Sequence, residues 1–276
     1  MRPPAGAVVT GAGRGLGKQI AELLASRGHT LLVTDVDGEA AAAAAASLGD
    51  RAFAMAVDVR DHTQVEAARD QIVDRAGRID TWVNNAGVLV TGPAWTQGAD
   101  LRRLMLDVNA LGTVNGTVAA IDAMRGTGGG HIVNIASLAG LTAVPGEAVY
   151  AASKHAVIGF SLSTIADLRA AGIDDIDISC VCPDGIWTPM LHDKLDDPGS
   201  AMSFSGKLLQ PEEVVAAVGR LLDRPRLVTS LPRWRGAAAR VAAAAPRLGL
   251  AAIPLTLAQG RRKQRQLREA GGPRRA

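Results

Sequence analysis

Tyr150 and Lys154 stand four positions apart, and Ser137 lies thirteen positions before the tyrosine. Because positions four apart lie on one face of a helix, we expect the Lys154 ammonium beside the Tyr150 phenol. A phenol has a pKa of about 10, and a neighbouring cation favours the phenolate and lowers that pKa. The pair would then serve as an acid/base group near neutral pH. The alternative is that both residues lie on an ordinary solvated helix face. The motifs in the rest of the chain decide between the two interpretations.

A glycine-rich segment follows the first apolar run of the chain. Residues 7–10 are apolar or β-branched, residues 11–17 read Gly-Ala-Gly-Arg-Gly-Leu-Gly, and an amphipathic stretch runs from 18 to 26. This order predicts a strand, a turn and a helix. Glycines allow positive φ and the close approach of a pyrophosphate, and the helix N-terminus offers free N–H groups. The segment therefore predicts a dinucleotide site.

Asp35 ends the second expected strand, 30–34, and lies eighteen residues after Gly17. The carboxylate that binds the adenosine ribose stands at a spacing of about 20 in such sites. It would accept both ribose hydroxyls and repel a 2′-phosphate, which favours NAD over NADP. Arg14 is the counter-argument, because it could pair with a 2′-phosphate. Asp35 is otherwise a strand-end carboxylate in a turn that continues to Asp37.

These residues give the chain a resemblance to the short-chain dehydrogenase/reductase family. Residues 10–17 match that family's Thr-Gly-x-x-x-Gly-x-Gly, and residues 84–87 match its Asn-Asn-Ala-Gly. Asp58 and Val59 follow the expected third strand, where the family contacts the adenine. Asn109 matches the family's active-site helix asparagine. The motifs run in the family's order from residue 7 to about 190. The resemblance implies an α/β fold, a single doubly wound parallel sheet, and nicotinamide-dependent oxidation of an alcohol or reduction of a ketone.

The resemblance also implies roles. Tyr150 removes the hydroxyl proton in the oxidative direction, Ser137 hydrogen-bonds the substrate oxygen, and Lys154 bonds the nicotinamide ribose. Asn109 completes the catalytic set by helping to hold a water that relays protons to Lys154. The expected cofactor-binding residues are Gly11, Arg14, Gly15, Leu16, Gly17, Asp35, Asp58, Val59, Asn85, Ala86, Gly87, Tyr150, Lys154, Pro183, Ile186 and Thr188.

One position departs from the family. After the sixth expected strand, 177–182, the family usually continues Pro-Gly, but here Asp184 follows Pro183. The turn approaches the nicotinamide, so we expect the extra carboxylate to alter cofactor affinity or turn geometry. Gly185 would compensate in part.

In the family the loop after Thr188 closes over the substrate, which predicts a lid at about 188–210. The lid and the expected pocket wall are mainly apolar, with few polar groups for orientation, which suits a lipophilic alcohol or ketone. Acyl chains on a carrier protein are the second option. The expected pocket residues are Leu138, Leu141, Val144, Trp187, Met190, Met202 and Phe204.

Length and composition bound the fold. The chain has 276 residues, 47% of them hydrophobic, which is ample for one buried core. We expect a Rossmann-like domain at 1–232 and an extension at 233–276. Cys180 and Cys182 are too close in sequence for an ordinary disulfide and read as buried thiols, and no metal site is expected. With no signal peptide recognised, the sequence favours a cytoplasmic protein.

The extension is strongly basic. Residues 1–225 hold 18 Lys and Arg against 26 Asp and Glu, whereas residues 226–276 hold 12 against one. Such a tail could fold back on its own domain, lie on an anionic membrane surface or bind nucleic acid. The uncharged run 248–260, broken by Pro254, is shorter than the about 20 residues of a spanning helix, but suits an interfacial one. Nucleic acid is not expected, because Trp234 is the tail's one aromatic residue. A disordered end is expected from Gly271.

Three functions remain open. The leading one is an NAD-dependent alcohol dehydrogenase or ketone reductase. An NADPH-dependent carbonyl or acyl-carrier reductase follows if Arg14 outweighs Asp35. A non-catalytic, cofactor-binding scaffold is the alternative of another class, against which the complete set of acid/base residues speaks. We expect a dimer through helices at about 98–124 and 147–171, because the extension would block a tetramer contact.

Overall fold

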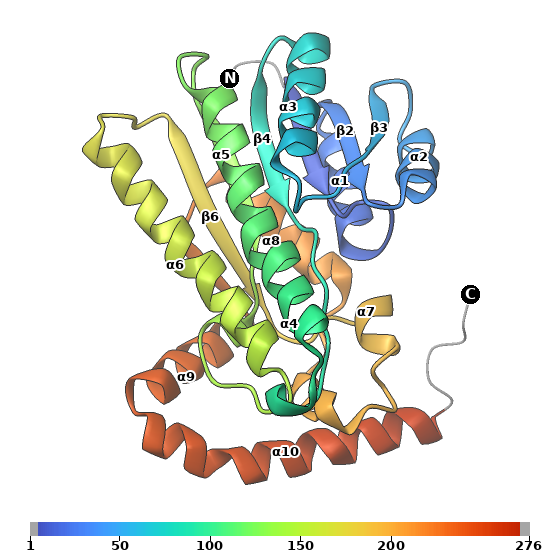
Figure 1. The fold of residues 1–276 in the computed structure, drawn as a ribbon, viewed down its shortest axis with the longest axis vertical. Helices are drawn as coiled ribbons and strands as arrows, with labels where there is room; N and C mark the ends of the chain where they lie inside the picture. The colour runs from blue at the N-terminus through green and yellow to red at the C-terminus, as the bar shows by residue number, and fades with distance from the viewer. Residues whose placement is uncertain (1–4, 271–276) are drawn as a thin grey trace.

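The computed structural model describes residues 5–270 (Figure 1). The disordered end expected from Gly271 lies outside the described residues. Within them, a parallel sheet of seven strands has the order β3-β2-β1-β4-β5-β6-β7. The strand order reverses between β1 and β4, which opens a crevice at the carboxyl ends of the strands. The strands are β1 Gly6–Thr10, β2 Thr30–Asp35, β3 Ala52–Ala56, β4 Ile79–Asn84, β5 Gly130–Ile135, β6 Ile176–Pro183 and β7 Val228–Leu231.

Helices cover both faces of the sheet, so the expected doubly wound α/β fold is confirmed. Alternate residues of a strand point to opposite faces, and in β1 Val9 packs toward α1, α2 and α8 while Val8 packs toward α3, α5 and α6. A π-helical turn, Asp107–Leu111, joins α4 to α5. The helices are α1 Gly15–Ser26, α2 Gly38–Ala46, α3 His62–Ala76, α4 Ala99–Leu106, α5 Gly112–Met124, α6 Ala148–Ala170, α7 Pro189–His192, α8 Pro211–Asp223, α9 Arg233–Ala244 and α10 Pro246–Glu269.

A buried chain of hydrogen bonds ties the sheet to α5 and α6. Asn84 of β4 accepts from the Trp82 indole at 2.8 Å, and it donates to Asn134 of β5 at 2.8 Å and to Thr117 of α5 at 3.1 Å. Asn134 in turn donates to Ser161 of α6 at 2.8 Å. Because buried amides left without partners would cost free energy, this satisfied chain fixes how the two helices sit over the strands.

The extension forms two helices, and Pro254 does not break the second of them. α9 is followed at once by α10, which contains Pro254 in its interior. Proline removes one backbone hydrogen bond, but the helix continues on both sides of it. In Figure 1 α10 runs across one end of the molecule beyond the carboxyl ends of the strands. Its second half packs against the 3₁₀ helix η4, Pro198–Phe204, of the lid.

Gly116 and Gly159 provide a matched test of this packing. A Cβ on Gly116 would lie 2.0 Å from Asn84 Oδ1, whereas a Cβ on Gly159 would meet nothing within 4 Å. We expect Gly116→Ala to lower the free energy of unfolding by about 1–3 kcal/mol, because it displaces the buried amide. Gly159→Ala should raise it by up to about 1 kcal/mol through helix propensity. Urea denaturation measures both, and a neutral Gly116→Ala would contradict the assigned packing.

Candidate active site

A cavity of about 1300 Å³ lies at the carboxyl ends of the strands. Its wall comes from the glycine turn after β1, the segments that follow β2 to β6, the start of α6, the lid, α9 and α10. Its volume exceeds the ordinary range of about 300–1000 Å³ for a small-molecule pocket, so it has room for a dinucleotide and a second molecule. The α/β switch point between β1 and β4 opens into it.

The glycine turn is shaped for a pyrophosphate. Gly11 and Gly15 have φ of 61° and 58°, which disfavour other residues. A Cβ on Gly17 would lie 2.3 Å from the Gly11 carbonyl oxygen, so α1 can begin this close to the turn only with glycine there. Nothing lies within 4 Å of a Cβ on Gly15, which leaves the turn open toward the cavity. The N-terminus of the 12-residue helix α1 thus faces a space that an anion fits.

Asp35 and Arg14 both line the cavity. The residue that favours NAD and the residue that favours NADP therefore lie in the same wall. Asp35 accepts the Gly13 N–H at 3.0 Å and the Asp37 N–H at 3.1 Å, which holds its carboxylate at the end of β2. The carboxylate is thereby fixed at the cavity wall. Its turn-forming role leaves the carboxylate beside the cavity, and its binding of a ribose stays a prediction.

The remaining expected cofactor residues also gather on this wall. Asp58 pairs with Arg60 at 2.5 Å, and this hydrogen bond lowers the pKa of the carboxyl. The Asn85 amide donates to the carbonyls of Thr10 and Gly11, which joins the ends of β1 and β4. All the expected cofactor-binding residues line the cavity, namely Gly11, Arg14, Gly15, Leu16, Gly17, Asp35, Asp58, Val59, Asn85, Ala86, Gly87, Tyr150, Lys154, Pro183, Ile186 and Thr188.

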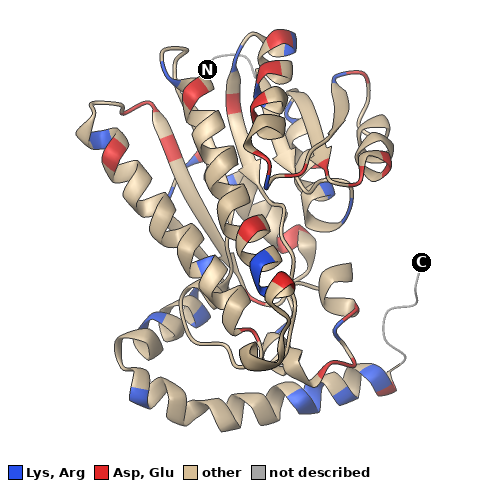
Figure 2. Cartoon of the chain, viewed as in Figure 1, with Lys and Arg blue, Asp and Glu red and all other residues tan. Residues whose placement is uncertain are grey.

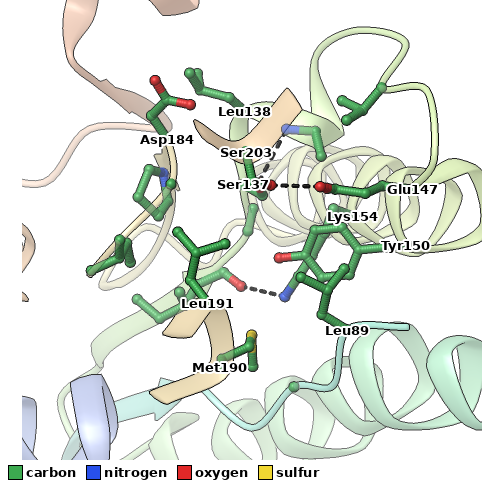
Figure 3. A pocket seen from close by; sticks show the side chains of 18 of the residues that line it. Leu89, Ser137, Leu138, Glu147, Tyr150, Lys154, Asp184, Met190, Leu191 and Ser203 are labelled. Carbon is green, nitrogen blue, oxygen red and sulfur yellow. Dashed lines mark hydrogen bonds between the residues drawn. The ribbon is translucent and has the colours of Figure 1, made fainter. Parts of the chain in front are cut away.

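Ser137, Tyr150 and Lys154 meet in the cavity (Figure 3). Lys154 Nζ donates to the Ile135 carbonyl at 2.9 Å and lies 5.7 Å from the centroid of the Tyr150 ring. Burial lowers the pKa of Lys154 to about 8. Burial raises the pKa of Tyr150, Glu147 adds to the rise, and a hydrogen bond with Ser137 opposes it.

The expected lowering of the Tyr150 pKa is therefore wrong. The ammonium of Lys154 is turned to a backbone carbonyl, and burial of the phenol dominates. The phenol is the favoured form of Tyr150 at neutral pH.

Asn109 takes a different place from the other three. Its side chain is fully buried in the π-helical turn and is not part of the cavity wall. Its amide accepts the Val88 N–H at 2.8 Å and donates to the Val88 carbonyl at 2.9 Å and to Ser153 Oγ at 3.0 Å. Asn109 therefore positions the segment after β4 against α6. Its part in holding a water stays a prediction.

Glu147 is a cavity residue that the sequence reasoning missed. It is the residue before α6, is 2% exposed, and accepts a 2.5 Å hydrogen bond from Ser203 of the lid (Figure 3). Burial raises the pKa of its carboxyl to about 7. Its spacing of three from Tyr150 and seven from Lys154 is the one sequence signal that could have placed it beside them, although its burial depends on the distant lid.

Asp184 forms an ion pair with Arg235 of α9, at 3.0 Å from Nε. The carboxyl side chain is 9% exposed, and burial raises its pKa while Arg235 opposes the rise. Arg235 also donates to Ser205 Oγ of the lid segment at 3.0 Å. The unusual carboxylate in the turn is thus matched by a cation from the extension, and both residues line the cavity.

The apolar pocket residues divide into two groups. Leu138, Val144, Met190 and Met202 line the cavity. Phe204, Trp187 and Leu141 do not line it. Phe204 is fully buried with Leu191 and Leu195, and Trp187 packs edge-on against His192. Leu141 packs beside the core around Val157. The lid needs its largest apolar side chains for its own small core. The expectation of few polar groups is corrected too, because Glu147 and Asp184 are in the wall.

Comparisons with known proteins agree with this geometry. A family model described as short chain dehydrogenase matches residues 5–199. The sex determination protein tasselseed-2 of Zea mays is 38% identical over 67% of this chain, and the match covers 56% of that protein. Cyclopentanol dehydrogenase of a Comamonas species is 35% identical over 76% of this chain and 86% of its own.

A solved structure shows the same fold. The short chain dehydrogenase/reductase from Burkholderia phymatum, determined in complex with NAD, superposes with a TM-score of 0.81 at 29% identity. The superposition covers 90% of this chain and 97% of that one. With the matching family model and relatives above 30% identity, this protein belongs to the short-chain dehydrogenase/reductase family of oxidoreductases.

Proposed function

We propose that this protein transfers a hydride between NAD(H) and a lipophilic secondary alcohol or ketone, with Tyr150 as the acid/base. The observation that carries the proposal is that the glycine turn, Ser137, Tyr150 and Lys154 line one cavity. The name of the related cyclopentanol dehydrogenase supports a secondary alcohol as the substrate class. The nicotinamide, when bound, accepts or supplies the hydride.

The chain's own residues move the proton. In reduction, the Tyr150 phenol donates its proton to the carbonyl oxygen, and Ser137 holds that oxygen by a hydrogen bond. Burial favours the phenol, which is the form that reduction requires. In oxidation the phenolate is needed, and burial of Tyr150 disfavours it, because the Lys154 ammonium donates to the Ile135 carbonyl and is 5.7 Å from the centroid of the phenol ring.

The cofactor preference rests on Asp35. Its carboxylate is held by two backbone N–H groups at the cavity wall, where it would accept ribose hydroxyls and repel a 2′-phosphate. Arg14 on the same wall keeps an NADPH-dependent carbonyl or acyl-carrier reductase as the second candidate. A non-catalytic scaffold is disfavoured, because it would need no acid/base pair in the cavity.

A dimer and a cytoplasmic location belong to the same proposal. Several large apolar side chains are exposed on the helices expected to pair, namely Leu101, Leu106, Leu111, Val118 and Leu162. Burying such a surface against a second copy is the usual solution for a soluble protein. Cys180 and Cys182 are free, buried thiols, which fits a reducing compartment.

Replacing Tyr150 by Phe tests the chemistry. We expect turnover of a secondary alcohol with NAD to fall by about 10²–10⁴-fold, because the proton transfer is lost. NADH binding, followed by nicotinamide fluorescence, should stay close to that of the wild type. Ser137→Ala is the companion variant and should lower turnover while leaving Tyr150 in place. Unchanged turnover of Tyr150→Phe would remove Tyr150 from the mechanism, and a wild type inactive on all such alcohols would favour the scaffold.

Separate titrations with NADH and NADPH test the cofactor assignment. We expect NADH to bind more tightly, and Asp35→Ala to weaken NADH binding by about 10–100-fold, because a charged hydrogen bond is worth about 1.5–3 kcal/mol. Asp35→Asn keeps an acceptor for the Gly13 N–H and separates the loss of charge from a loosened turn. Unchanged NADH affinity in both variants would show that Asp35 does not bind the ribose. Arg14→Ala should weaken NADPH binding alone.

Glu147→Gln tests the buried carboxyl. Its pKa rises from 4.5 to about 7 in the folded protein, so the folded state holds the proton more tightly than the unfolded chain. Wild-type stability should therefore fall as the pH rises from about 4.5 through 7, by at most on the order of 3 kcal/mol. Glu147→Gln should lose this dependence, and the exposed control Glu22→Gln should keep it. Melting temperatures at pH 5 and pH 8 measure the difference, and parallel curves for all three proteins would contradict the assignment.

A further inference from the structure

The helix α10 presents two different faces. Residues that line the cavity recur along one side, among them Gly249, Ile253 and Thr256. On the same face, in the second half of the helix, Gln264 anchors α10 to the lid: it is 4% exposed and donates to the Asp197 carbonyl and to Ser200 Oγ at 2.9 Å. Gly260 faces the Ala201 carbonyl, where a Cβ would lie only 1.9 Å away. This inner face is therefore part of the site.

The outer face of α10 is apolar in the middle. Leu248 and Leu255 are 74% and 77% exposed, and Ala251 and Ala258 between and after them are exposed too. Their spacing of three, four and three residues places them on one side of the helix. Two leucines so exposed, two turns apart on one side with exposed alanines between and after them, indicate a surface that contacts something apolar.

Cations stand at both ends of this apolar stripe. α10 carries Arg247 before it and Arg261, Arg262, Lys263, Arg265 and Arg268 after it, with Glu269 as its one acid. Figure 2 shows these two basic ends and the uncharged stretch between them, along the edge of the molecule. Arg268 is partly neutralised by Asp196 at 3.5 Å, but Arg261, Arg262 and Arg265 lie exposed on or beside the stripe. The pattern is that of a helix lying in the plane of an anionic membrane surface.

A second copy of the chain fits this face less well. Pairing two such stripes would bring their basic ends close together, and like charges at close range repel. A spanning helix is not the alternative either. Within residues 5–270 the one helical run long and apolar enough to cross a bilayer is 99–124, which packs against α3, β4 and β5 in the fold.

We propose that the outer face of α10 docks the protein on anionic lipid surfaces. The apolar stripe enters the headgroup region, and the flanking arginines pair with lipid phosphates. The inner face of the same helix then holds the cavity against the bilayer. Passage of a lipophilic substrate between bilayer and cavity follows from this placement, and that consequence alone rests on the proposed function.

Flotation of the full-length protein with lipid vesicles tests docking independently of catalysis. We expect binding to vesicles of phosphatidylcholine with phosphatidylglycerol, weak binding to phosphatidylcholine alone, and weakening by added salt. Arg261→Glu with Arg262→Glu should reduce the partition coefficient by about 30-fold or more, at about 1 kcal/mol for each lost cation. Arg224→Glu with Arg226→Glu, an exposed pair before β7, changes net charge equally and should leave binding intact.

The apolar stripe has its own pair of variants. Leu248→Glu with Leu255→Glu should abolish flotation, whereas Leu227→Glu, exposed before β7, should not. NADH binding and melting temperature should be unchanged in all these variants, which shows that they fold. Wild-type protein that fails to float with anionic vesicles overturns the proposal, even if turnover is normal. So does a stripe variant that floats normally, or one that instead dissociates an oligomer, which would assign the face to a second copy.

Discussion

The buried ammonium of Lys154 is the point on which the site depends. It is 4% exposed and donates to the last carbonyl of β5, so it fixes α6 against the carboxyl end of the sheet. Two other segments come close to its side chain or to its backbone. A Cβ on Gly87 would lie 3.7 Å from Nζ, and one on Gly140 would lie 2.6 Å from the Lys154 carbonyl oxygen. A charge in such surroundings costs free energy unless it is hydrogen-bonded, and the burial lowers its pKa to about 8. The burial that shapes the cavity therefore also brings the pKa of Lys154 close to neutral pH.

Two buried carboxyl groups in the cavity wall are each bound by a side chain from a distant segment. Glu147, beside the start of α6, is held by Ser203 of the lid, and Asp184, after β6, is held by Arg235 of α9. Removing either partner would leave a buried carboxyl group without a partner. This costs more free energy than an apolar residue at the same position. The cation that pairs with Asp184 is thus supplied by the extension. The extension is thereby a part of the site and not an appendage to it.

The apolar residues of the lid serve two purposes, a small core within the lid and the wall of the cavity. Phe204, Leu191 and Leu195 form a small core of their own, joined by Trp187 and by Leu267 of α10. Met190 and Met202 face the cavity without joining this core, and Leu191 belongs to both the core and the cavity wall. Methionine adapts its shape to different neighbours, which suits a pocket wall. The lid and α10 are thus held together by one apolar cluster and by the hydrogen bonds of Gln264.

The sequence by itself determined the sheet, the glycine turn and the spacing of Ser137, Tyr150 and Lys154. These are local properties, because strand and helix periodicity and short spacings along one helix are carried by neighbouring residues. Only the tertiary structure decided the direction of the Tyr150 pKa, the burial of Glu147, the withdrawal of Phe204 from the pocket and the partner of Asp184. Each of these depends on a segment far away in the chain. Desolvation and ion pairing act through space, so no pattern within one segment reveals them.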